Sequence, residues 1–244
     1  MVDGRLLGPL DMLPLEARSF VRTGYLPATE PGVLGRSSGF GGRAHLPDGV
    51  DHPVCPNCGQ PMPMLAQLAL SELPADARPD GSGLLQVFYC SEAPAGSDMP
   101  CDVDLEGWAA FSKAHCVRLV SDGPGQPSPA GVPYPGRRIV GWSAIQDCPN
   151  GEELADLGVP ISNAVAEALG AADIPRSGEK LGGWPNWIQG VEYPDCPECG
   201  NTMGLVLQID SEQNVPVMFG DMGIGHVTQC KTHPQVLAFA WACS

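Results

Sequence analysis

The sequence predicts an α+β fold dominated by antiparallel β-sheet, in which the two halves of the chain repeat one another with approximate two-fold symmetry. The 244 residues include 31 glycines and 26 prolines, and so many chain-breaking residues favour short strands joined by turns over long helices. Hydrophobic residues make up 43% of the chain, which is typical of a globular protein with a sizeable core. A cysteine motif that recurs in both halves indicates the internal repeat.

The internal repeat is the main organising feature of the chain. One segment, GGRAHLPDGVDHPVCPNCGQPMPMLAQLAL, begins at Gly41, and its counterpart, GGWPNWIQGVEYPDCPECGNTMGLVLQID, begins at Gly182. Aligned without a gap, they share the paired glycines, a C-P-x-C-G motif and a later Met and Gln. Chance rarely aligns so many Cys, Gly and Pro residues, so the similarity indicates a duplicated unit.

Strand-like segments follow each copy of the repeat in the same order. LLQVFYC, which ends at Cys90, resembles IGHVTQC, which ends at Cys230, and both are rich in β-branched and aromatic residues. CVRLV from Cys116 and LAFAWAC from Leu237 are predicted to form the next strand of each half. RRIVGWSAI, which starts at Arg137, reads as a further strand.

These segments divide the chain into a first half over residues 1–120, a Pro/Gly-rich linker over 121–136 and a second half over 137–244. We expect one compact unit, because each half alone is short and turn-rich. A short helix is predicted to begin where Asn150 and Glu153 form a capping box. The other expected helices span Pro14–Val21, Leu105–His115 and Ser162–Leu169.

The formal net charge of −15 limits the classes of partner. An acidic surface repels phosphate backbones, so nucleic acid is not expected to bind. Long-range attraction favours a basic protein partner or a cation, although the charge also serves solubility. No apolar stretch approaches the roughly 20 residues of a membrane-spanning helix, and the N-terminus does not read as a signal peptide. We therefore expect a cytoplasmic location and no membrane partner.

Ten cysteines in such a chain indicate metal ligands or reactive thiols and not disulfides. CPNC at Cys55–Cys58 and CPEC at Cys196–Cys199 each place two cysteines in a tight turn closed by glycine, which directs both sulfurs toward one point. Pairs of this kind are typical of structural zinc sites, which require two further ligands from elsewhere in the chain. We therefore predict two structural Zn²⁺ ions.

The missing ligands are predicted to follow the next strand of each half. In the second half, Cys230 and His233 complete a site of three thiolates and one imidazole with Cys196 and Cys199.

In the first half, Cys90 occupies the position of Cys230, and Cys101 is the expected fourth ligand with Cys55 and Cys58. Cys116 is the alternative, in a predicted strand at the position that Cys243 takes in the second half. Strand cysteines of this kind are more often small buried hydrophobes.

Redox chemistry is the alternative use of a CxxC pair. A redox dithiol is expected at a helix N-terminus beside a βαβ pattern, whereas here further ligands recur at matching positions in both halves. Four protein ligands leave no coordination position for water, so a catalytic zinc is disfavoured.

No familiar catalytic motif is present in the sequence. Asp221 and His226 on a Gly-rich segment could form an acid–base pair, although a turn leading into a strand is the simpler interpretation. Trp184 and Trp187 beside prolines and glycines indicate either an interaction surface or a small core that covers the second zinc knuckle, the predicted site around Cys196 and Cys199. We therefore predict no catalytic residue and no organic cofactor.

Several motifs together resemble the bacterial YwqG-like family, a domain of unknown function. In the second half these are LGGWPNWIQ, CPECG, LVLQIDS, FGDMGIGHVTQC and LAFAWAC, and in the first half GG, LAQLALSELP and GLLQVFYC, with IVGWSAIQD between them. The resemblance runs from about Gly41 to the C-terminus. Members often carry an Asp after the Gln-hydrophobic pair, which only Asp210 retains here.

The resemblance implies no established enzymatic activity. Some members lack the CxxC pairs, which implies that zinc is an addition to the shared fold. Members also resemble components of bacterial polymorphic toxin loci, where they are proposed to act as immunity factors. The expected function is a zinc-stabilised cytoplasmic module that binds a protein, such as a toxin. The alternative is an enzyme or small-ligand binder that uses the cleft between the repeats.

Overall fold

A computed structural model describes residues 8–93, 95–130 and 134–244. Within them a ten-stranded antiparallel sheet has the order β12-β11-β10-β9-β1-β8-β2-β4-β5-β6, and β3 pairs separately with β7. The strands are β1 (Arg22–Pro31), β2 (Gly39–Phe40), β3 (His45–Pro47), β4 (Met64–Ala69), β5 (Leu84–Tyr89), β6 (His115–Val120), β7 (Gly125–Pro127), β8 (Arg137–Asp147), β9 (Lys180–Gly182), β10 (Gly204–Asp210), β11 (Ile224–Gln229) and β12 (Leu237–Ala242). The predicted β-dominated fold is confirmed.

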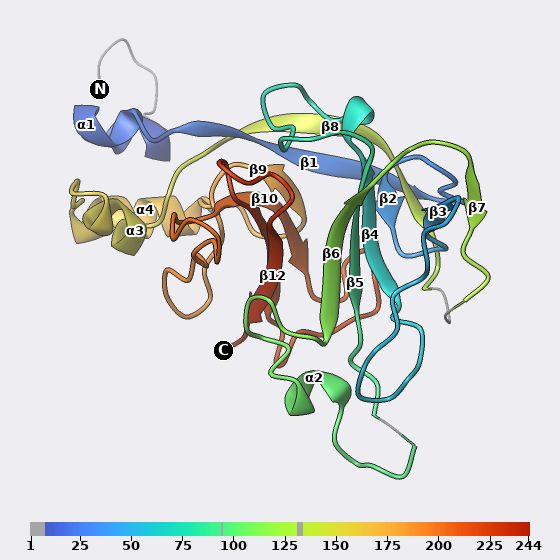
Figure 1. Cartoon of the computed structure of the whole chain (residues 1–244). Helices are drawn as coiled ribbons and strands as arrows, with labels where there is room; N and C mark the ends of the chain where they lie inside the picture. Colours follow the sequence, from blue (N-terminus) through green and yellow to red (C-terminus); the bar gives the residue numbers. More distant parts are fainter. Residues whose placement is uncertain (1–7, 94, 131–133) are drawn as a thin grey trace.

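The sheet curves until its outermost strands, β6 and β12, approach one another (Figure 1). Because side chains alternate between the two faces of a strand, every second residue points into the enclosed core. Tyr89 of β5 and Phe239 of β12 meet there with Phe219, with ring centroids 5.6 to 6.0 Å apart. The main core therefore contains side chains from both halves of the chain.

The long strands β1 and β8 pair at the middle of the sheet and carry a four-strand block on each side. In one block Gln67 of β4 lies opposite Gly39 of β2, and in the other Gln208 of β10 lies opposite Lys180 of β9. Both glutamines are buried and bind the loops that flank the neighbouring strand. The two halves are therefore alike in these local contacts.

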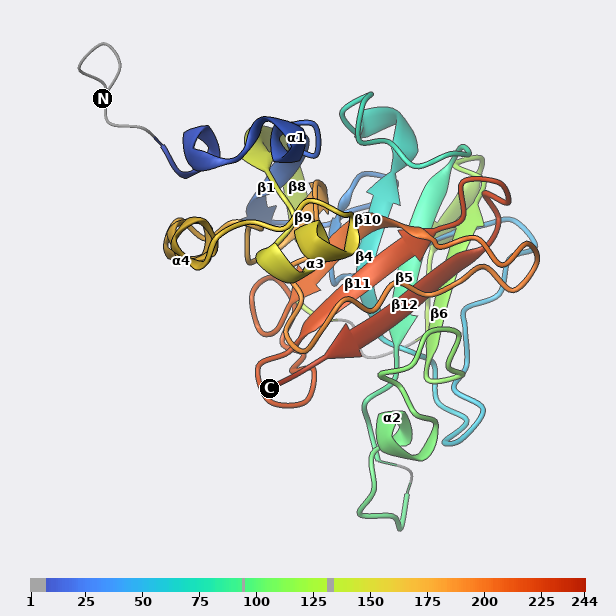
Figure 2. The same ribbon diagram turned by 90° about the vertical axis from the view of Figure 1, so that its left-hand side faces the viewer.

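Most helices gather at one end of the sheet (Figure 2). They are η1 (Pro9–Met12), α1 (Leu15–Arg18), α3 (Gly151–Asp156) and α4 (Asn163–Ala171), whereas η2 (Leu70–Glu72) and α2 (Cys101–Asp104) lie elsewhere. Asn150 caps α3, since its side chain accepts a hydrogen bond from the Glu153 N–H. Ser162 caps α4 in the same way.

The helix predicted over Leu105–His115 is wrong. The chain is helical only from Cys101 to Asp104, the following residues form turns, and His115 already belongs to β6. Glu106 and Phe111 have φ angles of 52° and 63°, in the left-handed region that a right-handed helix excludes.

A buried ion pair joins β8 to β9. The Nζ of Lys180 donates to an Oδ2 of Asp147 at 2.8 Å, and both side chains are 0% exposed. Asp147 also accepts hydrogen bonds from the backbone N–H groups of Cys148, Arg176 and Trp184. This carboxylate therefore fixes the segment between β8 and the Trp184 loop. No helix in the described ranges has the length and apolarity needed to cross a membrane.

Candidate metal centres

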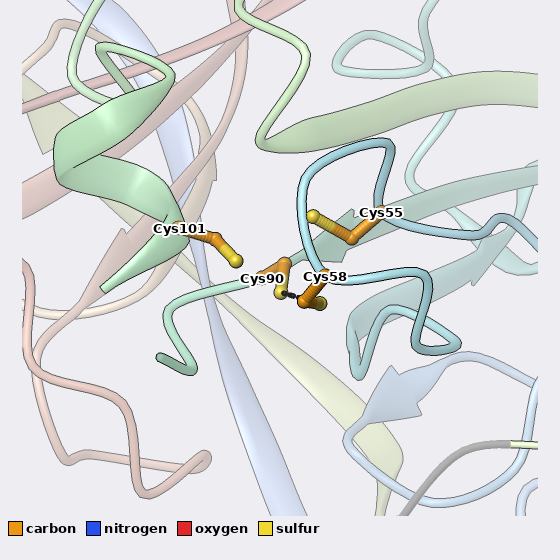
Figure 3. Close-up of side chains that lie close together, drawn as sticks. All are labelled: Cys55, Cys58, Cys90 and Cys101. Carbon is orange, nitrogen blue, oxygen red and sulfur yellow. Dashed lines mark hydrogen bonds between the residues drawn. The ribbon is translucent and has the colours of Figure 1, made fainter. Parts of the chain in front are cut away.

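The first cysteine cluster forms where the CPNCG turn, the end of β5 and the start of α2 meet (Figure 3). The sulfurs of Cys55, Cys58, Cys90 and Cys101 all lie within 4.8 Å of one another. The structure thus brings together the four residues predicted for this half. Cys116 instead lies on β6 opposite Phe88, and this strand position aligns with Ala238 of β12 and not with Cys243.

The second cluster combines the CPECG turn with the segment that follows β11. The ligand atoms of Cys196, Cys199, Cys230 and His233 also lie within 4.8 Å of one another. His233 turns its Nδ1 toward the sulfurs, at 3.6 Å from Cys196 and 3.9 Å from Cys230. All eight predicted site residues therefore fall into two compact groups of four.

The separations within each group match tetrahedral coordination. Zn–S bonds of about 2.3 Å at tetrahedral angles place two sulfurs about 3.8 Å apart. The Cys58 and Cys90 sulfurs are 3.7 Å apart, and the Cys199 and Cys230 sulfurs are 3.6 Å apart. A disulfide would require about 2.05 Å, so these are thiols positioned around a common point. Either group could hold a metal ion.

The two C-P-x-C-G turns have the same hydrogen bonds. The Gly59 N–H donates to the Cys55 carbonyl at 2.9 Å, and the Gly200 N–H donates to the Cys196 carbonyl at 2.8 Å. Both glycines have a φ of 70°, which a residue with a Cβ adopts only with strain. Glycine at this position therefore lets the chain reverse while both sulfurs remain on one side.

In each turn, the residue directly before the second cysteine contacts the fourth ligand of its own site. The side-chain amide of Asn57 lies 3.5 Å from the Cys101 sulfur and donates to Asp104 at 3.1 Å. In the second turn Glu198 places a carboxylate oxygen 3.6 Å from the Nε2 of His233. Partners of this type orient metal ligands. They were not predicted, because this position of the motif accepts almost any residue.

Hydrogen bonds offset the effect of burial on one thiol of each cluster. Burial raises the pKa of the Cys230 thiol, but hydrogen bonds from the His233 backbone, the Cys196 thiol, the Thr232 backbone and the Cys199 thiol together outweigh it and lower that pKa to about 7. Burial likewise opposes ionisation of Cys58, and hydrogen bonds from the Gln60 backbone and neighbouring thiols lower its pKa overall. One thiol of each cluster therefore favours the thiolate, the form that binds metal, whereas burial raises the pKa of Cys90 and Cys101 in the first cluster.

The predicted alternatives for catalysis gain no support from the geometry. Asp221 lies on the surface, whereas His226 is buried in β11, and no hydrogen bond joins them in the described structure. Trp184 packs against Phe20, and its indole donates to the Phe20 carbonyl. Trp187 lies between helix α3 and strand β11, where its indole donates to Glu153 and its ring contacts His226. Neither tryptophan belongs to the cluster of buried residues around the second knuckle.

The fold and the two clusters define a class of protein: a β-rich protein with two thiol-rich sites that could each hold a metal ion. The chain belongs to a family described as a domain of unknown function (DUF1963), whose model matches residues 38–232. The narrower resemblance to the YwqG-like family remains a prediction.

One curated protein shares a shorter segment. It is an uncharacterized protein of Salmonella typhimurium named YpfL, which is 44% identical over 46 residues. The match covers 18% of this chain and 11% of YpfL, so it reaches only a small part of either protein.

Proposed function

We propose that the protein is a cytoplasmic protein-binding module stabilised by two structural zinc ions. The observation that carries the proposal is that each cluster supplies four ligand atoms within 4.8 Å. Four protein ligands close a tetrahedral site and leave no position for a reacting water. Thiolate-rich tetrahedral sites suit zinc above the harder divalent cations, and one histidine in the second site is compatible with that choice.

The first zinc site would order a loop that presents apolar side chains to solvent. Cys101 lies at the start of α2, and the residues after it include exposed Val103, Trp108 and Phe111. Metal binding contributes free energy to folding. It can therefore order this loop, which the turn-rich chain alone would leave disordered. Exposed apolar groups of this kind are typical of surfaces that bind another protein.

The partner we propose is a basic protein, such as a toxin that this protein neutralises. The net charge of −15 favours association with a basic surface. We further infer that the two halves arose by duplication, since the C-P-x-C-G turns and the buried glutamines recur in both.

Gentle purification of the protein from its host cells, followed by native mass spectrometry, tests the proposal. We expect a stoichiometric protein partner with a basic isoelectric point and two zinc ions bound to this chain. A Trp108→Ser variant should lose the partner but keep both zinc ions. A wild-type protein that is recovered without any protein partner, under conditions that preserve other complexes, would contradict the binding role.

A second candidate function rests on a hollow of about 430 Å³ between the halves. Residues 76–80 of the first half line it, and its cations are Arg22, Arg78 and Lys231. The three cations outnumber the two carboxylates of the lining, Asp76 and Asp80, and this small excess of positive charge favours a small anionic ligand. The same mass spectrum tests this, because a bound small anion that Arg22→Ala abolishes would support a ligand-binding role in place of protein binding.

A further inference from the structure

The two halves differ on the outer face of the sheet. In the first half a chain of polar side chains crosses neighbouring strands: Arg118 Nε donates to the Gln86 side chain at 3.1 Å, and Gln86 Nε2 donates to Gln67 at 3.0 Å. The Arg118 guanidinium also donates to the Asp51 carbonyl and lies 5.2 Å from the Phe88 ring. The guanidinium thus extends the polar network of that half to β6, and its Nη2 is buried without a hydrogen-bond partner in the described residues.

The second half has the same strand register but lacks the arginine. Gln208, His226 and Ala240 lie opposite one another on β10, β11 and β12, as Gln67, Gln86 and Arg118 do on β4, β5 and β6. Alanine is too short to reach the imidazole.

Three buried polar atoms of the second half have no hydrogen-bond partner in the described part of the chain. One is the indole Nε1 of Trp241 on β12, and the other two lie on β11. The two on β11 are Nε2 of His226 and Oγ1 of Thr228, on residues that are only 5% and 2% exposed. Both side chains lie on the same face of β11, because they are two residues apart in a strand. A buried polar group without a partner is costly, so these atoms indicate a missing hydrogen-bonding group.

The two unpartnered atoms of β11 face a small hollow that opens into a groove on the protein surface. The hollow, bounded by His226, Thr228, Ala240 and Trp187, has about 10 Å³ of free space, enough for one water-sized group such as a terminal amino group. It adjoins a groove of about 560 Å³, and the two share Pro194, Trp241 and the exposed carboxylate of Glu192. Strands β11 and β12, which form the floor, lie side by side in Figure 2.

We propose that the hollow and the adjoining groove bind an arginine side chain from a basic protein partner, with one terminal amino group of the guanidinium in the hollow and the rest of the side chain in the groove, as a counterpart of Arg118 in the first half. The guanidinium would donate to His226 Nε2 and Thr228 Oγ1. Its stem would lie over Ala240 along the groove, and Glu192 would supply the opposing charge at the rim. The proposal rests on the protein-binding role inferred above and adds the chemistry that the partner presents.

The chemistry of the pocket fits a cation that donates hydrogen bonds. Burial, with a contribution from Lys180, lowers the pKa of His226 to about 3, so the imidazole is neutral at physiological pH and can offer a lone pair at Nε2. The Trp187 ring lies 4.8 Å from the imidazole and offers an aromatic face to a planar guanidinium.

Nuclear magnetic resonance with small probes tests the site without knowledge of the partner. Nα-acetyl-arginine amide is titrated into the zinc-loaded protein, and the ring nitrogens of His226 and the indole N–H of Trp187 are observed. We expect saturable shifts of both signals. The citrulline analogue, which has the same shape but no charge, should bind at least about tenfold more weakly.

Two variants and a matched control make the test specific. Ala240→Arg should fill the hollow from within, as Arg118 does, and abolish the shift at Trp187. Thr228→Val preserves shape but removes the hydroxyl, and should weaken binding several-fold with the fold intact. Arg118→Ala changes the equivalent position of the other half and should leave the Trp187 response unchanged.

Equal responses to arginine and citrulline amides, or no response at His226, would overturn the proposal. A partner that co-purifies while arginine amide fails to bind would refute this site and leave the protein-binding role standing. Selective arginine amide binding by a protein that captures no partner would support the site and refute the binding role.

Discussion

Replacement of Lys180 by methionine removes the cation of the buried ion pair between β8 and β9. The Lys180 Nζ lies 2.8 Å from Asp147, and neither side chain is exposed. Methionine fills a similar volume without a charge, so the main effect is to leave the Asp147 carboxylate buried without a counter-ion. Removing one partner of a buried pair costs about 3–5 kcal/mol.

The remaining contacts of Asp147 place the expected loss at the lower end of that range. The carboxylate keeps backbone N–H donors from Cys148, Arg176 and Trp184, which continue to stabilise its charge. We therefore expect a loss of about 3 kcal/mol, equivalent for a chain of this size to a decrease in melting temperature of roughly 10 °C.

Differential scanning calorimetry on the zinc-loaded protein measures this effect. Arg138→Met is the control, because Arg138 pairs with Glu30 on the surface, where the two side chains are 47% and 49% exposed. Such pairs contribute less than about 1 kcal/mol. If Lys180→Met lowers the melting temperature no more than Arg138→Met, the reasoning about the buried pair is refuted.

Three further predictions follow from other buried or capping groups. Burial raises the pKa of Glu179 to about 7. The contribution of Glu179 to the stability of the folded protein is therefore fully present below about pH 4.5, the pKa in the unfolded chain, and is lost as the pH rises through about 7. Glu179→Gln should therefore gain stability relative to wild type between about pH 5 and pH 8 in thermal melts, and a constant difference would contradict this. Asn150→Ala removes the cap of α3 and should cost about 1 kcal/mol in urea unfolding, whereas an unchanged midpoint would exclude the cap. Cys199→Ser should lower the melting temperature in a zinc-dependent manner and Cys116→Ser should not, as thermal melts with and without a chelator would reveal; equal responses of the two variants would argue against the assigned ligands.

The cysteine clusters could be predicted from the sequence because most of the information is local. A C-P-x-C-G turn directs two sulfurs to one point, and Cys90 and Cys230 end strands that the repeat itself aligns. Cys101 was harder to choose over Cys116, since only the strand register shows that Cys116 lies within β6 opposite Phe88.

Other features depend on contacts that no local pattern reveals. Lys180 lies in a short polar segment typical of a turn, and its partner is known only once β1 brings β8 and β9 close together. The segment after α2 has helix-forming composition, but Glu106 and Phe111 adopt left-handed backbone angles there. The contrast between Arg118 and Ala240 likewise becomes visible only when the strands of both halves are in register.

The metal content of the purified protein tests the central claim most directly. Inductively coupled plasma mass spectrometry should find about two zinc ions per wild-type chain and about one in each of Cys58→Ser and Cys199→Ser, because each substitution removes a ligand from a different group of four. A wild-type protein that folds normally without metal, or variants that retain the full zinc content, would contradict the assignment of both clusters as structural zinc sites.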